Sequence, residues 1–300
     1  MSSPSVQPVP PVPDLTPPDL AAHRLAALRA ELDRLDDGLH DALMRRAELV
    51  AQVGALGVKG AVPLRPGREA SIIRRLLARH RGGLAAATVV RIWRELLAGT
   101  NSQQRPMLIT VCEPETGPSL LAVAREHFGA LTPVSARRSP AQAIRDVSAG
   151  AATAAVLPLP AEDETPALAW WTALLQRDDP RIHVVARLPF WAGRPEGAPQ
   201  GQALVVTAAA PDPSGHDRSL IGLEVPLEIS RDRLAGLLAA AGLTLEPLIL
   251  RRDPGAPLAW ALADVAGFVA DSDPRLALLP FAPSPPVVLG AYAIPVGDSP

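Results

Sequence analysis

The sequence predicts a multi-domain protein: an all-α N-terminal domain of three helices, then an α/β region and an α+β ferredoxin-like region. Three observations support this prediction. Apolar residues recur every three or four positions through residues 21–56 without an intervening proline, which is the period of a helix. After Pro106, short apolar runs alternate with helical segments, as in α/β structure. The last segment has the order βαββαβ, which is typical of a ferredoxin-like sandwich.

Composition narrows the class of protein. The 300 residues suffice for two or three domains, and 48% of them are apolar. A net charge of −2 gives no indication of nucleic-acid binding, and no apolar stretch is long enough to span a membrane. Cys112 is the single cysteine, so we expect no intrachain disulfide, no metal and no cofactor. The N-terminus has no secretory pattern, so we expect a cytoplasmic protein.

The N-terminal part begins with residues 1–18, whose seven prolines predict a disordered tail. The helix predicted over residues 21–56 would be about 54 Å long. This exceeds the diameter of about 26 Å expected of a small domain. The helix therefore needs a partner along its length, and a second copy of the chain is the simplest one. We expect an intertwined homodimer.

Two shorter helices complete a domain over residues 19–105. A loop covers residues 57–64, and Pro66 lies where the first turn of a helix tolerates proline. That helix is predicted to run to about His80, where Arg81-Gly82-Gly83 breaks it. The third helix is predicted from about Ala85 to Gln104.

The remaining elements form two predicted regions, residues 106–192 and residues 202–297, joined by a Gly- and Pro-rich linker. The first region is predicted to contain, in order, strand Leu108–Cys112, helix Ser119–Phe128, strand Leu131–Ser135, helix Ala141–Ala149, strand Ala154–Leu157, helix Ala167–Gln176 and strand Ile182–Leu188. The second is predicted as Ser219–Val225, Arg231–Ala241, Leu243–Arg251, Leu258–Val269, Pro274–Leu279 and Val287–Ile294.

Arginines give the N-terminal domain its chemical character. Residues 19–105 hold 14 Arg and 1 Lys against 9 Asp and Glu, which suits a small anionic ligand or, equally, a solvated helical surface. Arg29 and Arg46 are 17 positions apart, or about 25 Å along a helix, and cannot touch one small ligand in a single chain. An antiparallel dimer would let Arg29 of one copy approach Arg46 of the other. Spacing alone favours two solvent-facing arginines.

Four ordered blocks resemble the all-helical (type II, bacterial) chorismate mutase family. They are Leu28–Asp36, Leu43–Leu49 with Val53-Gly54, Arg65–Glu69, and Ile92–Leu97 followed by Thr100 and Gln104. The resemblance implies the rearrangement of chorismate to prephenate in aromatic amino-acid biosynthesis. This pericyclic reaction requires a compact dianion conformer and stabilisation of the breaking ether oxygen. Arginines suit the two carboxylates.

The resemblance also implies a role for each matching residue. Arg46 and the Arg29 of the other copy bind the two carboxylates, and Thr100 lies near one of them. Glu69 accepts a hydrogen bond from the ring hydroxyl with Arg68 beside it, and Gln104 donates to the ether oxygen.

One position departs from the family. The lysine expected three residues after Gly54 is replaced by Gly57, and the only lysine of the chain, Lys59, follows two positions later. On a continuous helix this turns the side chain by about 200°, whereas a helix that ends at Gly57 would let Lys59 reach the site. We expect Lys59 to be the catalytic cation. The alternatives are an isochorismate pyruvate lyase-like enzyme and an impaired pseudo-mutase that acts as a dimerisation or regulatory protein.

The C-terminal half resembles a degenerate prephenate dehydratase followed by a degenerate ACT domain. Leu108–Pro158 with Ile182–Phe190 is similar to one dehydratase lobe, and residues 219–294 are similar to an ACT domain. The Thr-Arg-Phe motif of the dehydratase and most of its second lobe are absent, so we expect no dehydratase activity.

Overall fold

The structure is a computed structural model that describes residues 17–56, 64–113, 115–194, 196–281 and 284–297. The chain divides into two compact units, residues 1–56 and residues 57–300, and each unit is described by itself. The predicted tail falls almost entirely on residues 1–16, which lie outside the described residues, as do Gly57 and Lys59.

The described part of the first unit contains one helix, α1 (Pro17–Ala55), of 39 residues. Its length is about 58 Å, and it confirms the long helix predicted from the apolar period, although it begins four residues earlier. The leucines of the predicted apolar face are exposed in the single chain, with Leu28 at 56% and Leu39 at 62% exposure. No described helix combines the length and the apolar character needed to cross a bilayer.

The second unit opens with α2 (Pro66–Arg79) and α3 (Ala86–Gln104). Both helices lie within one or two residues of their predicted bounds. Pro66 occupies the first turn of α2, where its missing N–H costs no helical hydrogen bond. The two helices bury their apolar faces against each other and against Phe190 and Ala293 from the C-terminal half.

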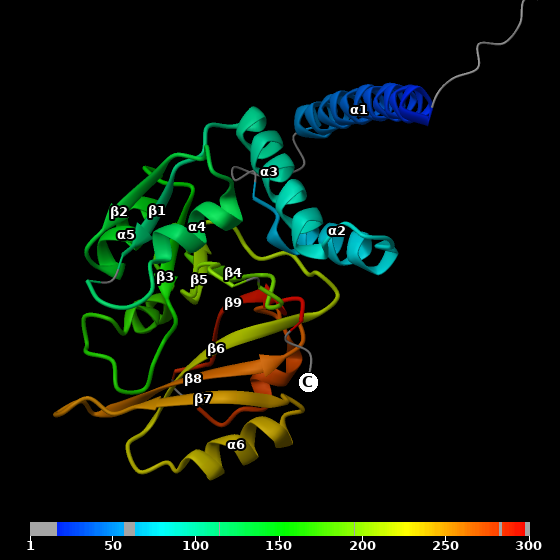
Figure 1. Ribbon diagram of the computed structural model, residues 1–300. Coiled ribbons are helices and arrows are strands. Elements are labelled where there is room, and N and C mark those ends of the chain that lie inside the picture. Colours follow the sequence, from blue (N-terminus) through cyan, green and yellow to red (C-terminus); the bar gives the residue numbers. More distant parts are fainter. Residues whose placement is uncertain (1–16, 57–63, 114, 195, 282–283, 298–300) are drawn as a thin grey trace, which may run out of the picture. The chain divides into compact units, whose positions relative to one another are not determined.

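One nine-stranded sheet holds the strands of both C-terminal regions, in the order β2-β1-β3-β5-β4-β9-β6-β8-β7 (Figure 1). The strands are β1 (Ile109–Cys112), β2 (Val134–Arg137), β3 (Ala154–Pro158), β4 (His183–Leu188), β5 (Ala203–Thr207), β6 (Asp217–Pro226), β7 (Leu245–Arg251), β8 (Leu258–Ala266) and β9 (Val287–Ala293). The α/β and ferredoxin-like regions are joined where β4 and β9 pair in parallel, through Val184 and Gly290.

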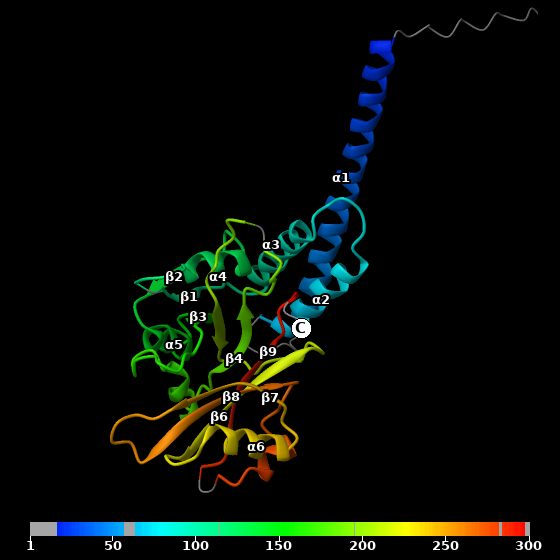
Figure 2. The same cartoon turned by 60° about the horizontal axis from the view of Figure 1, so that its bottom comes forward.

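The last four strands confirm the predicted ferredoxin-like region. Their spatial order β9-β6-β8-β7 follows from the βαββαβ sequence, and all three pairings are antiparallel. Helix α6 (Arg231–Ala240) and the 3-10 helix η2 (Pro274–Leu278) contribute to a core on one face of these strands. Figure 2 shows α6 along this part of the sheet.

The α/β region differs from its prediction in three places, the first of which is β2, predicted over Leu131–Ser135 but found at Val134–Arg137. Helices α4 (Leu120–Phe128) and α5 (Pro140–Ser148) are as predicted, but the expected helix Ala167–Gln176 is a shorter 3-10 helix, η1 (Trp170–Gln176). Strand β5 was not predicted, because its four apolar residues follow a Gly- and Pro-rich run and show no alternation. It pairs with β3 and β4, although residues 202–297 were assigned to the ferredoxin-like region; that boundary stays a prediction.

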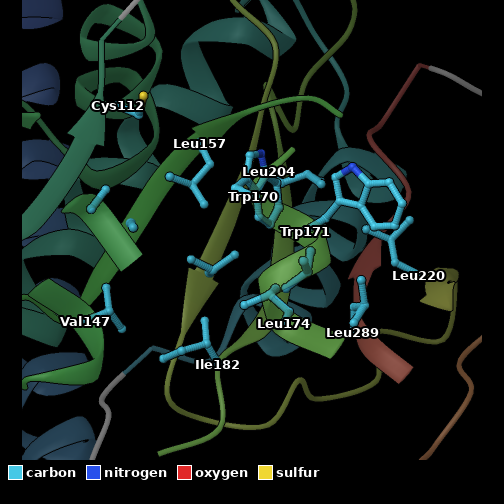
Figure 3. Packing of buried hydrophobic residues seen from close by; sticks show 14 of the residues in the cluster. Cys112, Val147, Leu157, Trp170, Trp171, Leu174, Ile182, Leu204, Leu220 and Leu289 are labelled. Atoms are coloured by element: carbon cyan, nitrogen blue, oxygen red, sulfur yellow. The ribbon is translucent and has the colours of Figure 1, made fainter. Parts of the chain in front are cut away.

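The sheet face opposite α6 carries a second core that crosses the join between the two regions. Trp170 and Trp171 of η1 are buried there, together with Leu204 of β5 and Leu220 of β6. Figure 3 shows these side chains gathered around the two tryptophans. Both tryptophans are therefore packing residues, and each indole N–H is bonded: Trp170 to the carbonyl of Pro158 and Trp171 to Glu164.

Candidate functional site

The predicted site residues are divided between the two units. Arg29 and Arg46 lie on α1 in the first unit, about 25 Å apart along the helix axis. Arg68, Glu69, Thr100 and Gln104 lie in the second unit, on α2 and α3. Within the second unit, the structure brings Glu69 of α2 against α3. The position of Lys59 falls outside the described residues.

Glu69 is the best-defined residue of the candidate site. The residue is 8% exposed, and its carboxylate accepts hydrogen bonds from two groups on α3. Arg94 Nη1 lies 3.1 Å from Oε2, and Asn101 Nδ2 lies 2.9 Å from Oε1. A buried carboxylate requires such partners, because an unpaired charge is costly away from water. The two donors therefore fix the orientation of this carboxylate.

Arg94 is itself enclosed by the fold. Its guanidinium lies 5.1 Å from the ring centre of Phe190, within the range of a cation–π interaction. Burial lowers the pKa of Arg94, and the negative charges of Glu69 and Glu126 act in the opposite direction. The same surroundings affect His127. Burial and the positive charge of Arg94 hold the pKa of His127 well below its ordinary value. Arg94 thus pairs with Glu69, and its positive charge opposes protonation of His127.

The side chains of Thr100 and Gln104 donate hydrogen bonds to backbone carbonyls of α3. The Thr100 hydroxyl is buried and donates to the carbonyls of Leu96 and Leu97, at 2.9 and 3.1 Å. Gln104 Nε2 donates to the Thr100 carbonyl at 3.3 Å. The four-residue spacing places both residues on one face of α3, next to Asn101, which contacts Glu69.

The N-terminus of α2 is anchored by a residue from far along the sequence. Asp212 accepts hydrogen bonds from the backbone N–H groups of Gly67 and Arg68, at 3.1 and 3.0 Å. Its carboxylate also lies 3.5 Å from Nε of Arg65. An acceptor at this place satisfies N–H groups that the helix leaves open and carries the charge that a helix N-terminus favours. The side chain of Arg68 is exposed next to this anchor.

Arg94, Asn101 and Asp212 were not singled out by the sequence. Arg94 and Asn101 lie 25 and 32 positions after Glu69. Both lie in or next to the Ile92–Leu97 and Thr100 blocks, so pairing these blocks with the Arg65–Glu69 block could have suggested them. Asp212 had no such signal, because it lies among turn-forming residues 144 positions after Arg68.

The described residues define a class of protein in which helices that carry the predicted site residues are followed in the sequence by an α/β sheet. The family model "Chorismate mutase type II" matches residues 28–105, so this segment is a chorismate mutase type II domain.

Curated relatives are similar to less than half of this chain. The bifunctional chorismate mutase/prephenate dehydratase of Pseudomonas aeruginosa is 28% identical over 142 residues, which are 45% of this chain and 39% of the relative. The protein of the same name from Neisseria gonorrhoeae is 32% identical over 101 residues, 34% of this chain and 27% of the relative. The match thus spans well under half the length of these relatives.

Two solved structures share a broad likeness that covers 62% of this chain. A quorum-quenching acylase, GqqA, has a TM-score of 0.46 at 18% identity, with 94% of that chain covered. Prephenate dehydratase from Arthrobacter aurescens, in complex with L-Phe, has a TM-score of 0.45 at 16% identity, with 90% covered.

Proposed function

We propose that the protein is a chorismate mutase that converts chorismate to prephenate in aromatic amino-acid biosynthesis. The observation that carries this proposal is the Glu69 carboxylate, fixed by Arg94 and Asn101 within the segment that matches the chorismate mutase type II family. A carboxylate held in place can accept a hydrogen bond from a substrate hydroxyl without reorganising, which is how a site selects one conformer of a flexible substrate.

In the proposed mechanism, charged and amide side chains surround the substrate dianion. Arg46 and Arg29 bind one carboxylate each, because a guanidinium matches a carboxylate with two parallel hydrogen bonds. Thr100 lies near a carboxylate, and Arg68 lies beside Glu69. Gln104 and the cation of Lys59 stabilise the negative charge that grows on the breaking ether oxygen. No proton has to be transferred.

The proposed active form is a cytoplasmic homodimer. The exposed leucines of α1 support the homodimer. The apolar face of this helix of about 58 Å is unburied in the single chain, and burying it against a second copy would stabilise the protein. In an antiparallel pair, Arg29 of one copy and Arg46 of the other contribute to the same site. Each dimer then holds two sites built from both chains.

The mutase proposal is tested by incubating the full chain with chorismate and following the loss of chorismate absorbance. Prephenate formation is the expected result. Arg46→Ala should reduce kcat/KM by a factor of about 100 or more, the typical effect of removing one charge-stabilising donor. Its neighbour Arg45, which is exposed and pairs with Glu48, provides the matched control, and Arg45→Ala should stay within about twofold of wild type.

Other outcomes of this assay would overturn the proposal. Conversion of isochorismate to salicylate and pyruvate would identify the lyase, and turnover of neither substrate would identify a pseudo-mutase. Full activity of Arg46→Ala would show that the site lies elsewhere.

Shared sites are tested by co-expressing Arg29→Ala and Arg46→Ala chains with two different affinity tags. The purified heterodimer has one site with both arginines and one with neither, so it should recover about half the wild-type activity. Each variant homodimer should be inactive. A heterodimer as inactive as its parents would contradict a site built from both chains.

We also propose that the protein has no prephenate dehydratase activity. The Thr-Arg-Phe motif is absent from the sequence, and only residues 159–181 separate the segments that resemble the dehydratase lobe. Incubation with prephenate at near-neutral pH should form no phenylpyruvate beyond the rate without protein. Catalysed phenylpyruvate formation would overturn this part of the proposal.

A further inference from the structure

A cavity of about 230 Å³ lies on one face of the sheet, where the strands of the α/β and ferredoxin-like regions meet. Leu204 of β5 and Leu220 and Leu262 of the ferredoxin-like strands form its apolar floor. The walls are formed by residues after β3 and by alternate residues of β7, namely Leu159, Pro160, Pro247 and Ile249. Figure 3 shows Leu204 and Leu220 beside the neighbouring tryptophan core.

Three polar side chains line this cavity: Arg187, Asp264 and Tyr292. The Asp264 carboxylate is already engaged on both oxygens. Arg218 Nε donates to Oδ1 at 2.9 Å, and the Tyr292 hydroxyl donates to Oδ2 at 2.5 Å. Burial raises the pKa of Asp264, and burial next to this carboxylate raises the pKa of Tyr292. Both oxygens of Asp264 therefore already have a donor at this end of the cavity.

Arg187 has a different environment. Its nearest hydrogen-bond partner is the side-chain oxygen of Gln202, at 3.5 Å from Nη2, which is the outer limit of such a bond. No ion pair of Arg187 is formed among the described residues, although its positive charge acts on Asp264 and Tyr292 and opposes the rise of both pKa values. The guanidinium of Arg187 is thus a cation beside an apolar cavity. Most of its N–H donors have no hydrogen-bond partner among the described residues.

We propose that this cavity binds a small carboxylate with an apolar or aromatic body, its carboxylate on Arg187 and its body on Leu204, Leu220 and Leu262. The guanidinium supplies two parallel donors to a carboxylate. The volume is below the range of about 300–1,000 Å³ of drug-sized pockets, which limits the ligand to roughly ten non-hydrogen atoms. Because the cavity is lined by both regions of the sheet, a bound ligand links them. This inference is independent of the proposed mutase activity.

The test uses benzoate as the probe and the full chain as the target, with saturation-transfer NMR to detect weak binding. Benzoate should bind with a Kd of about 1 mM or tighter. Arg187→Gln should weaken binding at least about tenfold, since a charge-assisted hydrogen bond is lost. Ile249→Trp, which fills the cavity and keeps the charge, should weaken it as well. The control is Arg233→Gln on the exposed face of α6, which should leave binding unchanged.

Several outcomes would overturn the proposal. They are an absence of benzoate binding, equal binding by benzyl alcohol, displacement of benzoate by inorganic phosphate, and an undiminished affinity of Arg187→Gln. If Arg187→Gln fails to fold, Arg187→Lys keeps the charge but loses the paired donors, and it should bind benzoate more weakly than wild type. Unchanged binding by Arg187→Lys would contradict the proposed contact.

Discussion

Asp212 and Gly67 are 145 positions apart in the sequence, and the Asp212 carboxylate accepts a hydrogen bond from the Gly67 backbone N–H at 3.1 Å. The approach is so close that a Cβ at position 67 would lie 2.1 Å from the Asp212 carbonyl oxygen. Glycine is therefore required at this point. Through this contact, the segment that precedes β6 holds the helix turn that carries Arg68 and Glu69.

Replacing Asp212 tests this anchor. Asp212→Ala removes the acceptor for two N–H groups at the start of α2 and should lower the free energy of unfolding by about 1–2 kcal/mol, as for other lost helix caps. Urea unfolding of the full chain measures the change. Asp178→Ala at an exposed position is the control and should change stability by less than about 0.5 kcal/mol. Equal stability of the two variants would contradict the anchoring role.

The Glu69–Arg94 pair should be strongly coupled. Arg94→Met removes the Arg94 guanidinium from the buried Glu69 carboxylate and should cost about 3–5 kcal/mol in urea unfolding. The double variant Glu69→Gln/Arg94→Met should cost clearly less than the sum of the single changes, because no charge is left unpaired. Arg91→Met at an exposed position of α3 is the control. Additive effects in the double variant would contradict a direct ion pair.

Gly290 should be essential at the join between β4 and β9. Its φ of +140° is unfavourable for other residues, and a Cβ there would lie 2.0 Å from the Val184 carbonyl oxygen. Gly290→Ala should therefore lower the melting temperature sharply or prevent folding. Gly236→Ala provides the opposite case, because it lies within α6 with open space around its Cβ position. This change should stabilise the helix by roughly 0.5–1 kcal/mol. A normal melting temperature for Gly290→Ala would contradict the close β4–β9 contact.

The free energy of unfolding should fall as the pH drops below about 6.5, because His127 is protonated more readily in the unfolded chain than in the folded protein. Its pKa in the folded protein is held well below the ordinary value by burial and by Arg94, whereas the unfolded chain takes up the proton near pH 6.5. The stability contribution is therefore present above that pH and is lost as the pH falls toward the folded pKa. His127→Gln should reduce the slope of unfolding free energy between pH 7 and 5 by up to about 1 kcal/mol per pH unit. His23→Gln, on the exposed surface of α1, should leave it unchanged, and an unaltered slope in His127→Gln would assign the pH dependence to other groups.

Local patterns in the sequence predicted most of the helices and strands. The three helices of the chorismate mutase segment followed from an apolar period and from prolines and glycines at their ends, which act within a few residues. The ferredoxin-like order of β6 to β9 followed from the sequence of elements. Strand β5 was missed because its strand conformation depends on pairing with β3 and β4, and the 3-10 geometry of η1 depends on the packing of its two tryptophans.

The sequence by itself determined where the helices and the ferredoxin-like strands lie and which residues resemble a mutase site, because period, caps and motif blocks are short-range features. Only the tertiary structure decided that Arg94 and Asn101 bind Glu69, that Asp212 anchors α2, and that two regions share one sheet. The physical reason is that a buried polar group takes whichever partner the packing brings within reach, and packing joins positions that are far apart in the chain.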